Sequence, residues 1–282
     1  MSPKKDAFKG KMAIVAGGSS GMGKEIAKQL VLKGTSVAIL ARSRDKLNAA
    51  KKEIEDGITG QDLFVDVLQA DVTDKSQIEK EFNDFLAKRG TPDFLFNCAG
   101  ACFPKLIEDY TIADYEDAMR LNYLGTVITT MELLPRFISE KKGHLINISS
   151  AGGYIGIIGL ATYVPAKFAV VGFSEVLRHE LKPKGIKVSV VFPPDTDTPG
   201  FEEENKTKPE ACKIVSGHGN LMQPDEVARV ILKGVKKDKF YIFPGNTKFI
   251  FKMKAFFPGL VYKIIDDDLK KANKIMESRS KE

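Results

Sequence analysis

The residue types best suited to chemistry lie near the middle of this sequence, where Ser149 and Ser150 are followed by Tyr163 and Lys167. A tyrosine hydroxyl can donate a proton to a ketone oxygen while a hydride reaches the carbon. A free tyrosine, however, titrates at about pH 10, too high for fast proton exchange at neutral pH. A lysine one helical turn later lies on the same face, and its ammonium favours the phenolate. A serine hydroxyl can stabilise the developing alkoxide by hydrogen bonding. The group predicts interconversion of a ketone and an alcohol.

Each of these residues also has an ordinary structural interpretation. A tyrosine and a lysine four positions apart on a helix are often surface neighbours only. Two serines at the end of an apolar run often form a turn or cap the next helix. The choice depends on the elements that position them.

A glycine-rich loop follows the first apolar run, Met12–Ala16, and precedes a helical pattern. Small residues let the backbone approach a pyrophosphate, whose charge then lies at the helix N-terminus. A tight turn between strand and helix is the alternative, but the position directly after the first strand favours a dinucleotide. The expected cofactor contacts in this loop are Gly17, Ser19, Ser20, Gly21, Met22 and Gly23.

The end of the second apolar run indicates which dinucleotide is bound. An NAD enzyme normally has an acid here that accepts from the ribose 2′-hydroxyl and repels a 2′-phosphate. This sequence has Ala41, followed by Arg42, Ser43 and Arg44. Because guanidinium groups pair with phosphate in a bidentate way, we expect NADPH or NADP. Two solvated arginines at the start of a helix are the alternative.

Apolar runs alternate with amphipathic helical patterns along most of the chain, which indicates βαβ units and a parallel sheet covered on both faces. Right-handed crossovers then favour a doubly wound nucleotide-binding sheet. The sequence predicts a single α/β domain of the Rossmann type over residues 1–245. The expected strands are Met12–Ala16, Ser36–Leu40, Phe64–Gln69, Phe94–Asn97, Leu145–Ile148, Val188–Phe192 and Phe240–Phe243.

The spacing Gly17-x3-Gly21-x-Gly23, together with Tyr163 and Lys167, resembles the classical short-chain dehydrogenase/reductase family over roughly residues 8 to 245. The resemblance implies a seven-stranded sheet. It favours Ser150 over Ser149 as the catalytic serine, because Ser150 stands at the family's usual distance from the tyrosine. It also implies that Asn122 is a fourth catalytic residue, which positions a water.

Further cofactor positions follow from this resemblance alone. It assigns Thr198 to the nicotinamide amide and Asp71 to the adenine side. The family usually has Thr where this chain has Ala16, and Asn where it has Cys98, so the glycine loop is expected to be slightly looser. The remaining matched cofactor positions are Val72, Asn97, Ala99, Gly100, Tyr163, Lys167, Pro193 and Thr196.

Residues 193–223 form a long polar stretch, which we expect to be a flexible lid over the substrate. Its beginning, Pro-Pro-Asp-Thr-Asp-Thr-Pro-Gly-Phe, is similar to the 3-ketodihydrosphingosine reductases within that family. The similarity implies NADPH-dependent reduction of 3-oxosphinganine to sphinganine. A reductase for another hydrophobic carbonyl (3-oxoacyl, steroid or retinoid) and a non-catalytic NADP-binding sensor are the alternatives.

The same similarity implies a substrate with a protonated amine beside its ketone. Asp195, Asp197 and Glu202–Glu204 are expected to supply the counter-charge, while Ser150 and Tyr163 contact the ketone. An acidic, solvated lid without substrate contact is the alternative.

Residues 246–282 are predicted to be a basic, amphipathic helical extension that Pro258 and Gly259 divide into two short helices. This pattern suits peripheral contact with a membrane surface. Packing on the protein's own core or on a second subunit is equally compatible with it. The family resemblance also implies a homo-oligomer, either a dimer or a tetramer.

Composition excludes several other classes of protein. The 282 residues have a net charge of +6 and no Trp, without the basic patch and aromatic readers typical of nucleic-acid binding. Three cysteines and three histidines lack metal-site spacing, so no metal is expected and the thiols should stay reduced in a cytoplasm. Residues 1–11 contain lysines but no apolar run, so neither a signal peptide nor an anchor is expected. We therefore predict a cytoplasmic protein, with membrane contact confined to the cytosolic face.

Overall fold

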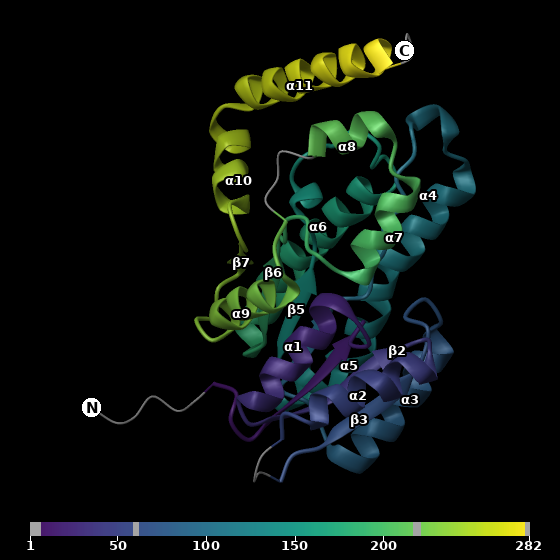
Figure 1. Ribbon diagram of the computed structural model, residues 1–282. Helices are drawn as coiled ribbons and strands as arrows, with labels where there is room; N and C mark the ends of the chain where they lie inside the picture. The colour runs from purple at the N-terminus through teal and green to yellow at the C-terminus, as the bar shows by residue number, and fades with distance from the viewer. Residues whose placement is uncertain (1–6, 59–61, 217–220, 280–282) are drawn as a thin grey trace.

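The computed structural model describes residues 7–58, 62–216 and 221–279, and a seven-stranded sheet lies at its centre (Figure 1). All neighbouring strands are parallel, in the order β3-β2-β1-β4-β5-β6-β7. The strands are β1 (Lys11–Ala16), β2 (Thr35–Ala41), β3 (Val65–Gln69), β4 (Phe94–Asn97), β5 (His144–Ile148), β6 (Lys187–Val191) and β7 (Tyr241–Ile242). Their ends differ from the predicted ends by at most one residue, and the α/β prediction is confirmed.

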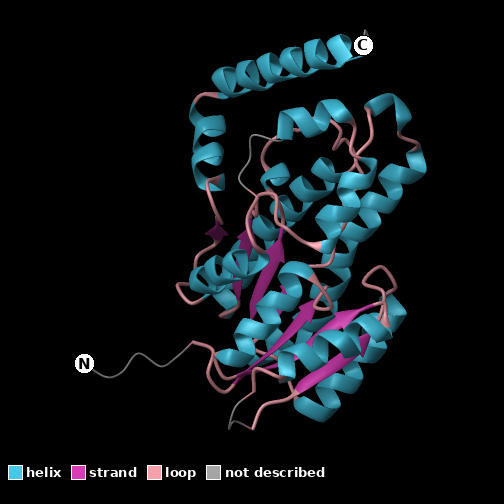
Figure 2. Ribbon diagram, in the orientation of Figure 1, coloured by secondary structure: helices cyan, strands magenta, loops and turns pink. Residues whose placement is uncertain are grey.

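Helices cover both faces of the sheet, as the continuous burial of the strands requires (Figure 2). Apolar side chains of α1, α2 and α9 pack on one face, and those of α3, α5 and α6 pack on the other. The helices are α1 (Gly21–Leu32), α2 (Arg44–Glu55), α3 (Lys75–Arg89), α4 (Ile112–Met119), α5 (Gly125–Glu140), α6 (Tyr163–Leu181) and α9 (Pro224–Val235). The short turns are η1 (Ile107–Asp109), η2 (Arg120–Leu124), η3 (Ala151–Gly153) and η4 (Lys182–Lys184).

The strand order determines where a ligand can bind. β1 lies between β2 and β4, so the chain leaves β1 toward one side of the sheet and later returns on the other. A crevice forms at such a switch point, beyond the carboxyl ends of the strands. The loops that follow β1, β2, β4 and β5 therefore meet at one edge of the sheet.

The segment after β6 is a pair of helices rather than the flexible stretch predicted from its polarity. Thr198 caps α7 (Pro199–Thr207), accepting a hydrogen bond from the Phe201 N–H at 3.1 Å, and Pro199 occupies the first helical position. A second helix, α8 (Glu210–Ser216), follows. The sequence did not reveal these helices because they are short and rich in charged residues. Residues 217–220 of the predicted lid lie outside the described residues.

The C-terminal extension forms α10 (Thr247–Phe256) and α11 (Pro258–Arg279), which meet at the predicted proline. The second helix has 22 residues and is not short, so that part of the prediction is wrong. In Figure 1, α11 extends across the top of the molecule beside α8, against which it packs. Within the described ranges, the structure contains no helix with the length and apolar character needed to cross a membrane.

Candidate active site

The glycine loop after β1 can only be built from small residues. Gly17 has φ 84°, and a Cβ there would lie 2.7 Å from the Ala99 nitrogen. A Cβ at Gly23 would collide with the carbonyl oxygen of Gly17. The loop therefore allows the backbone of α1 to start directly beside β4, with its N-terminus open to an anion.

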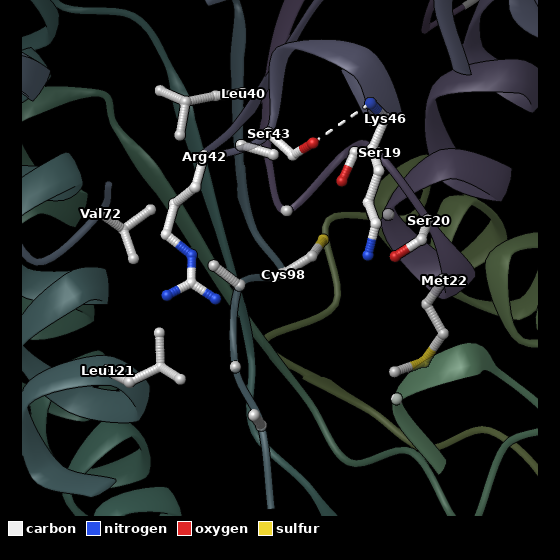
Figure 3. A pocket seen from close by; sticks show the side chains of 18 of the residues that line it. Ser19, Ser20, Met22, Leu40, Arg42, Ser43, Lys46, Val72, Cys98 and Leu121 are labelled. Atoms are coloured by element: carbon white, nitrogen blue, oxygen red, sulfur yellow. Dashed lines mark hydrogen bonds between the residues drawn. The ribbon is translucent and has the colours of Figure 1, made fainter. Parts of the chain in front are cut away.

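A cavity of about 320 Å³ lies at this N-terminus, and its lining is consistent with a dinucleotide. One end is formed by the glycine loop, and the other by the residues that follow β2 and β3 (Figure 3). Predicted cofactor residues that line it are Gly17, Ser19, Ser20, Gly21, Met22, Gly23, Arg42, Ser43, Asp71, Val72, Ala99, Gly100 and Thr198. The bare loop, the open helix N-terminus and the basic groups thus match the phosphates of such a cofactor.

Two cations reach this cavity, and one of them was not anticipated. The Arg42 side chain is 73% exposed, and its Nη1 lies 3.8 Å from a carboxylate oxygen of Asp71. Lys46, in the first turn of α2, also lines the cavity and points toward the serines of the glycine loop (Figure 3). Arg44 instead lines a separate surface depression. Arg42 precedes the helix cap Ser43, whereas Arg44 and Lys46 lie in the first turn of α2 and point in different directions from its axis.

Asn97 does not line the cavity, because its side chain is buried and hydrogen-bonded to neighbouring elements. Its amide donates to Asn147 Oδ1 at 2.9 Å and to Thr130 Oγ1 at 3.1 Å. Thr129 Oγ1 donates to Asn97 Oδ1 at 2.8 Å. This buried network joins β4 to β5 and α5 at the point where both strands end.

A second cavity adjoins the first and brings the predicted catalytic residues together. Ser150, Tyr163 and Lys167 all line it. Tyr163 is the first residue of α6, and Lys167 Nζ lies 5.4 Å from the centre of its ring. Pro165 lies in the first turn of this helix, where a missing N–H costs no hydrogen bond.

The two serines have different roles in this geometry. The Ser149 hydroxyl donates to the backbone carbonyl of Lys167 at 2.9 Å and is fully buried, so it holds α6 against β5. The Ser150 hydroxyl accepts from the Gly152 N–H at 3.1 Å, and its interaction with Tyr163 lowers the pKa of the tyrosine hydroxyl. The structure therefore places Ser150, not Ser149, beside the tyrosine hydroxyl.

The electrostatics of the site favour a protonated tyrosine. Burial raises the pKa of Tyr163, and the hydrogen bond with Ser150 opposes this rise. Burial also lowers the pKa of Lys167 to about 8. The lysine was expected to favour the phenolate, but burial outweighs that effect here. A neutral tyrosine is the form that donates a proton to a ketone oxygen, but the raised pKa makes Tyr163 a weaker acid, so proton donation benefits from a positive charge brought close to it.

Asn122 lies behind the lysine in η2, a turn of π-helix between α4 and α5. Its side chain accepts from the Ala101 N–H at 3.1 Å and donates to the Ala101 carbonyl at 2.9 Å. A Cβ at Gly100 would lie 2.7 Å from Asn122 Oδ1 and 3.2 Å from Lys167 Nζ. Both side chains therefore depend on the glycine after β4.

The segment after β6 completes the second cavity. Pro193, Asp195, Thr196 and Thr198 line it, whereas Asp197 does not. The Asp197 carboxylate accepts from Gln223 Nε2 at 3.1 Å instead. Of the acidic residues Glu202–Glu204 that the sequence also offered as counter-charge, Glu204 lines the cavity. The helix cap Thr198-Pro199 is the signal that distinguishes it, because it predicts that Phe201 and Glu204 share one face of α7.

Cys98, where the family usually has Asn, lines both cavities. Burial raises the pKa of its thiol to about 12, which keeps it protonated. A protonated thiol is a poor nucleophile. Cys98 therefore adds apolar surface to the site rather than a second reactive group.

Comparisons with known proteins agree with the geometry of the site. The sequence pattern of the family described as short chain dehydrogenase matches residues 11–209. The chain is 38% identical over 241 residues to the 3-dehydrosphinganine reductase of Danio rerio, covering 85% of this chain and 73% of that protein. It is 36% identical over 270 residues to the 3-ketodihydrosphingosine reductase of Dictyostelium discoideum, covering 86% and 81%.

Solved structures support the fold. Levodione reductase has a TM-score of 0.74 at 22% identity and covers 84% of this chain and 96% of its own. A short-chain dehydrogenase from Sphingobium yanoikuyae in complex with NADPH has a TM-score of 0.74 at 23% identity, covering 89% and 95%. The chain therefore belongs to the short chain dehydrogenase family.

Proposed function

We propose that this protein is an NADPH-dependent reductase that converts 3-oxosphinganine to sphinganine. The observation that carries this assignment is the meeting of Ser150, Tyr163 and Lys167 in a cavity next to a dinucleotide-shaped one. The relatives with 36–38% identity bear the names 3-dehydrosphinganine reductase and 3-ketodihydrosphingosine reductase. Both the site and the relatives thus favour reduction of this long-chain amino ketone.

The chain's own residues account for the proton transfer. Ser150 hydrogen-bonds the ketone oxygen and holds it beside Tyr163, which donates its proton as negative charge develops on that oxygen. Lys167 places a second proton-bearing group next to the tyrosine, and Asn122 keeps the chain around Gly100 close to that lysine. NADPH, when bound, supplies the hydride that adds to the ketone carbon.

Arg42 and Lys46 account for the choice of cofactor. Both lie at the end of the first cavity formed by the residues after β2, where a 2′-phosphate would replace the hydroxyl of NAD. The residue at the end of β2 is Ala41, so this position has no carboxylate to repel that phosphate.

The test is NADPH oxidation by the purified protein with 3-oxosphinganine in detergent, in parallel with Tyr163→Phe and with NADH. Turnover is expected with NADPH, and a loss of at least about 100-fold in Tyr163→Phe. Thermal unfolding of the variant should match the parent protein, since the ring is kept. Turnover of other hydrophobic ketones but not of 3-oxosphinganine would refute the proposed substrate, while the proposed reaction class would still hold.

We further propose that the C-terminal helices contact an anionic membrane surface from the cytosolic side. They expose large apolar side chains, and Lys248, Lys252 and Lys263 are exposed among them. Such a basic, amphipathic surface is complementary to anionic lipid. The exposed apolar residues are Phe249, Phe256, Phe257, Leu260, Tyr262, Ile264 and Ile275.

Vesicle sedimentation tests this contact. Binding should be stronger to vesicles of phosphatidylcholine with phosphatidylserine than to phosphatidylcholine alone, and should weaken in Phe256→Ser/Phe257→Ser. An equal affinity for both vesicles, or no effect of the double substitution, would contradict the proposal.

We also propose that the protein is a homo-oligomer that uses the outer faces of α5 and α6. These helices expose Met131, Phe168 and Val176, which are 41–54% accessible. Light scattering coupled to size exclusion should give a mass of at least two chains, and Val176→Lys should lower it. A monomeric mass at micromolar concentration would contradict this proposal.

A further inference from the structure

Three charged side chains that take no part in the proton transfer lie at the second cavity or directly beside its lining residues. Asp195 follows β6, and Glu204 lies on α7; both line the cavity. Lys208, one turn after Glu204, is almost completely buried behind them. Two negative charges and one positive charge therefore lie at this part of the cavity lining.

Lys208 forms an ion pair with Glu204 and not with Asp195. Lys208 Nζ lies 3.0 Å from Glu204, with side-chain exposures of 5% and 16%. It also lies 5.1 Å from the centre of the Phe201 ring, which fixes its position further. Within residues 7–58, 62–216 and 221–279, no cation lies at ion-pair distance from Asp195, and Lys208 acts on it only at longer range.

Asp195 is nevertheless reachable from the cavity. Its surface is exposed, although the surrounding protein raises the pKa of its carboxyl by burial. A carboxylate that lines a substrate cavity, and that has no cation at ion-pair distance among the described residues, can bind a cation on the substrate.

We propose that Asp195 is the specificity-determining residue of this site and that it binds the protonated amine next to the substrate's ketone, while the Glu204–Lys208 pair forms the wall behind it. This inference rests on the proposed function. It differs from the expectation that Asp195 and Asp197 act together, because Asp197 faces Gln223.

The effect of the two carboxylates on the proton donor, Tyr163, supports the same role for Asp195. The charges of Glu204 and Asp195 add to the rise in the pKa of Tyr163. An ammonium group bound between Asp195 and the ketone would offset that effect. An amino ketone therefore improves proton transfer where an uncharged ketone of the same length does not.

The same geometry discriminates against other substrates. An uncharged ketone would leave Asp195 desolvated without a partner, which costs affinity. A substrate on an anionic carrier would meet net negative charge at this wall. The site therefore selects long-chain ketones that have a cationic amine at the adjacent carbon.

The experiment compares steady-state constants for two ketones, 3-oxosphinganine and 1-hydroxyoctadecan-3-one, which is the same chain without the amine. Asp195→Asn should raise the KM for the amino ketone about 10- to 100-fold and leave the KM for the desamino ketone unchanged or lower. Asp197→Asn is the matched control, since it removes a carboxylate two residues away that does not line the cavity.

Glu204→Gln is the second variant, and it removes the charge of the side chain while keeping its volume. It releases Lys208 from its partner, and the freed ammonium then competes for Asp195. The KM for the amino ketone should rise, again without a change for the desamino ketone. NADPH binding, followed by nucleotide fluorescence, should be equal in all variants.

The outcomes separate this inference from the proposed function. If the parent protein turns over 3-oxosphinganine and Asp195→Asn leaves the ratio of the two KM values unchanged, the role of Asp195 is refuted while the function stands. If the parent protein reduces only other ketones, both fail. If Asp197→Asn alone changes the ratio, the amine binds to the carboxylate that the structure turns away.

Discussion

At the scale of single residues, the cofactor cavity distinguishes two arginines that are two positions apart in the sequence. Arg42 lines the cavity and Arg44 does not. We predict that Arg42→Ala raises the KM for NADPH about 10-fold, since an exposed guanidinium loses one charge-assisted pair. The KM for NADH should change little. Arg44→Ala is the control, and an equal effect of both substitutions on NADPH would show that the 2′-phosphate lies elsewhere.

Burial of Lys167, which we propose to be catalytic, reduces the stability of the folded protein at neutral pH. Its pKa is about 8 in the folded protein against about 10.5 in the unfolded chain. Below pH 8 both states hold the proton, so the folded protein bears the full burial penalty. The penalty disappears as the pH rises from about 8 to 10.5, where the folded state releases the proton first.

We therefore predict that Lys167→Met abolishes turnover and raises the free energy of unfolding of the cofactor-free protein at pH 7 by about 1–3 kcal/mol. The gain should shrink at pH 9.5. Urea unfolding at the two pH values measures it. A loss of stability at pH 7, or a gain independent of pH, would show that the hydrogen bond from Lys167 to the Ile148 carbonyl dominates instead.

At the scale of elements, α10 has two sides that the sequence pattern does not distinguish. Phe251 packs against Tyr154 and Phe192, with ring centres 5.3 and 6.1 Å away, whereas Phe256 is 74% exposed. We predict that Phe251→Ala lowers the free energy of unfolding by about 2–3 kcal/mol, and that Phe256→Ala changes it by less than about 0.5 kcal/mol. Urea unfolding of the two variants compares them directly. Equal effects would mean that α10 does not dock on β6 in this orientation.

How far the sequence predicts an element depends on where its apolar residues lie. All seven strands are recognisable because they are buried on both faces and read as apolar runs between amphipathic helices. The helices α7 and α8 were not recognised, because they are short and lie in a stretch rich in charged residues. Arg44 was assigned to the cofactor because the rotation of a helix start cannot be read from residue types. The preference for Ser150 over Ser149 came from the family's usual distance to the tyrosine.

At the scale of the whole molecule, the cofactor cavity joins the loops after β1, β2 and β4 to α7 through Thr198. Binding in it should therefore stabilise the whole domain by mass action. We predict that NADPH at about 100 times its dissociation constant raises the free energy of unfolding by about 2.7 kcal/mol. NADH at the same concentration should stabilise the protein less. Thermal unfolding with each nucleotide measures the difference, and equal shifts would contradict the NADPH preference.

The pairing of β1 with β4 also determines how the chain must assemble during its synthesis. Ala13 pairs with Phe94, about 80 residues later in the sequence. At roughly 5–20 residues per second, a ribosome needs about 4–16 s to synthesise the residues between them. Throughout that interval one edge of β1 has its backbone groups unpaired and its apolar side chains uncovered on that side. Chaperone demand for the nascent chain should therefore be greatest before residue 97 emerges, and should fall once β4 has closed the centre of the sheet.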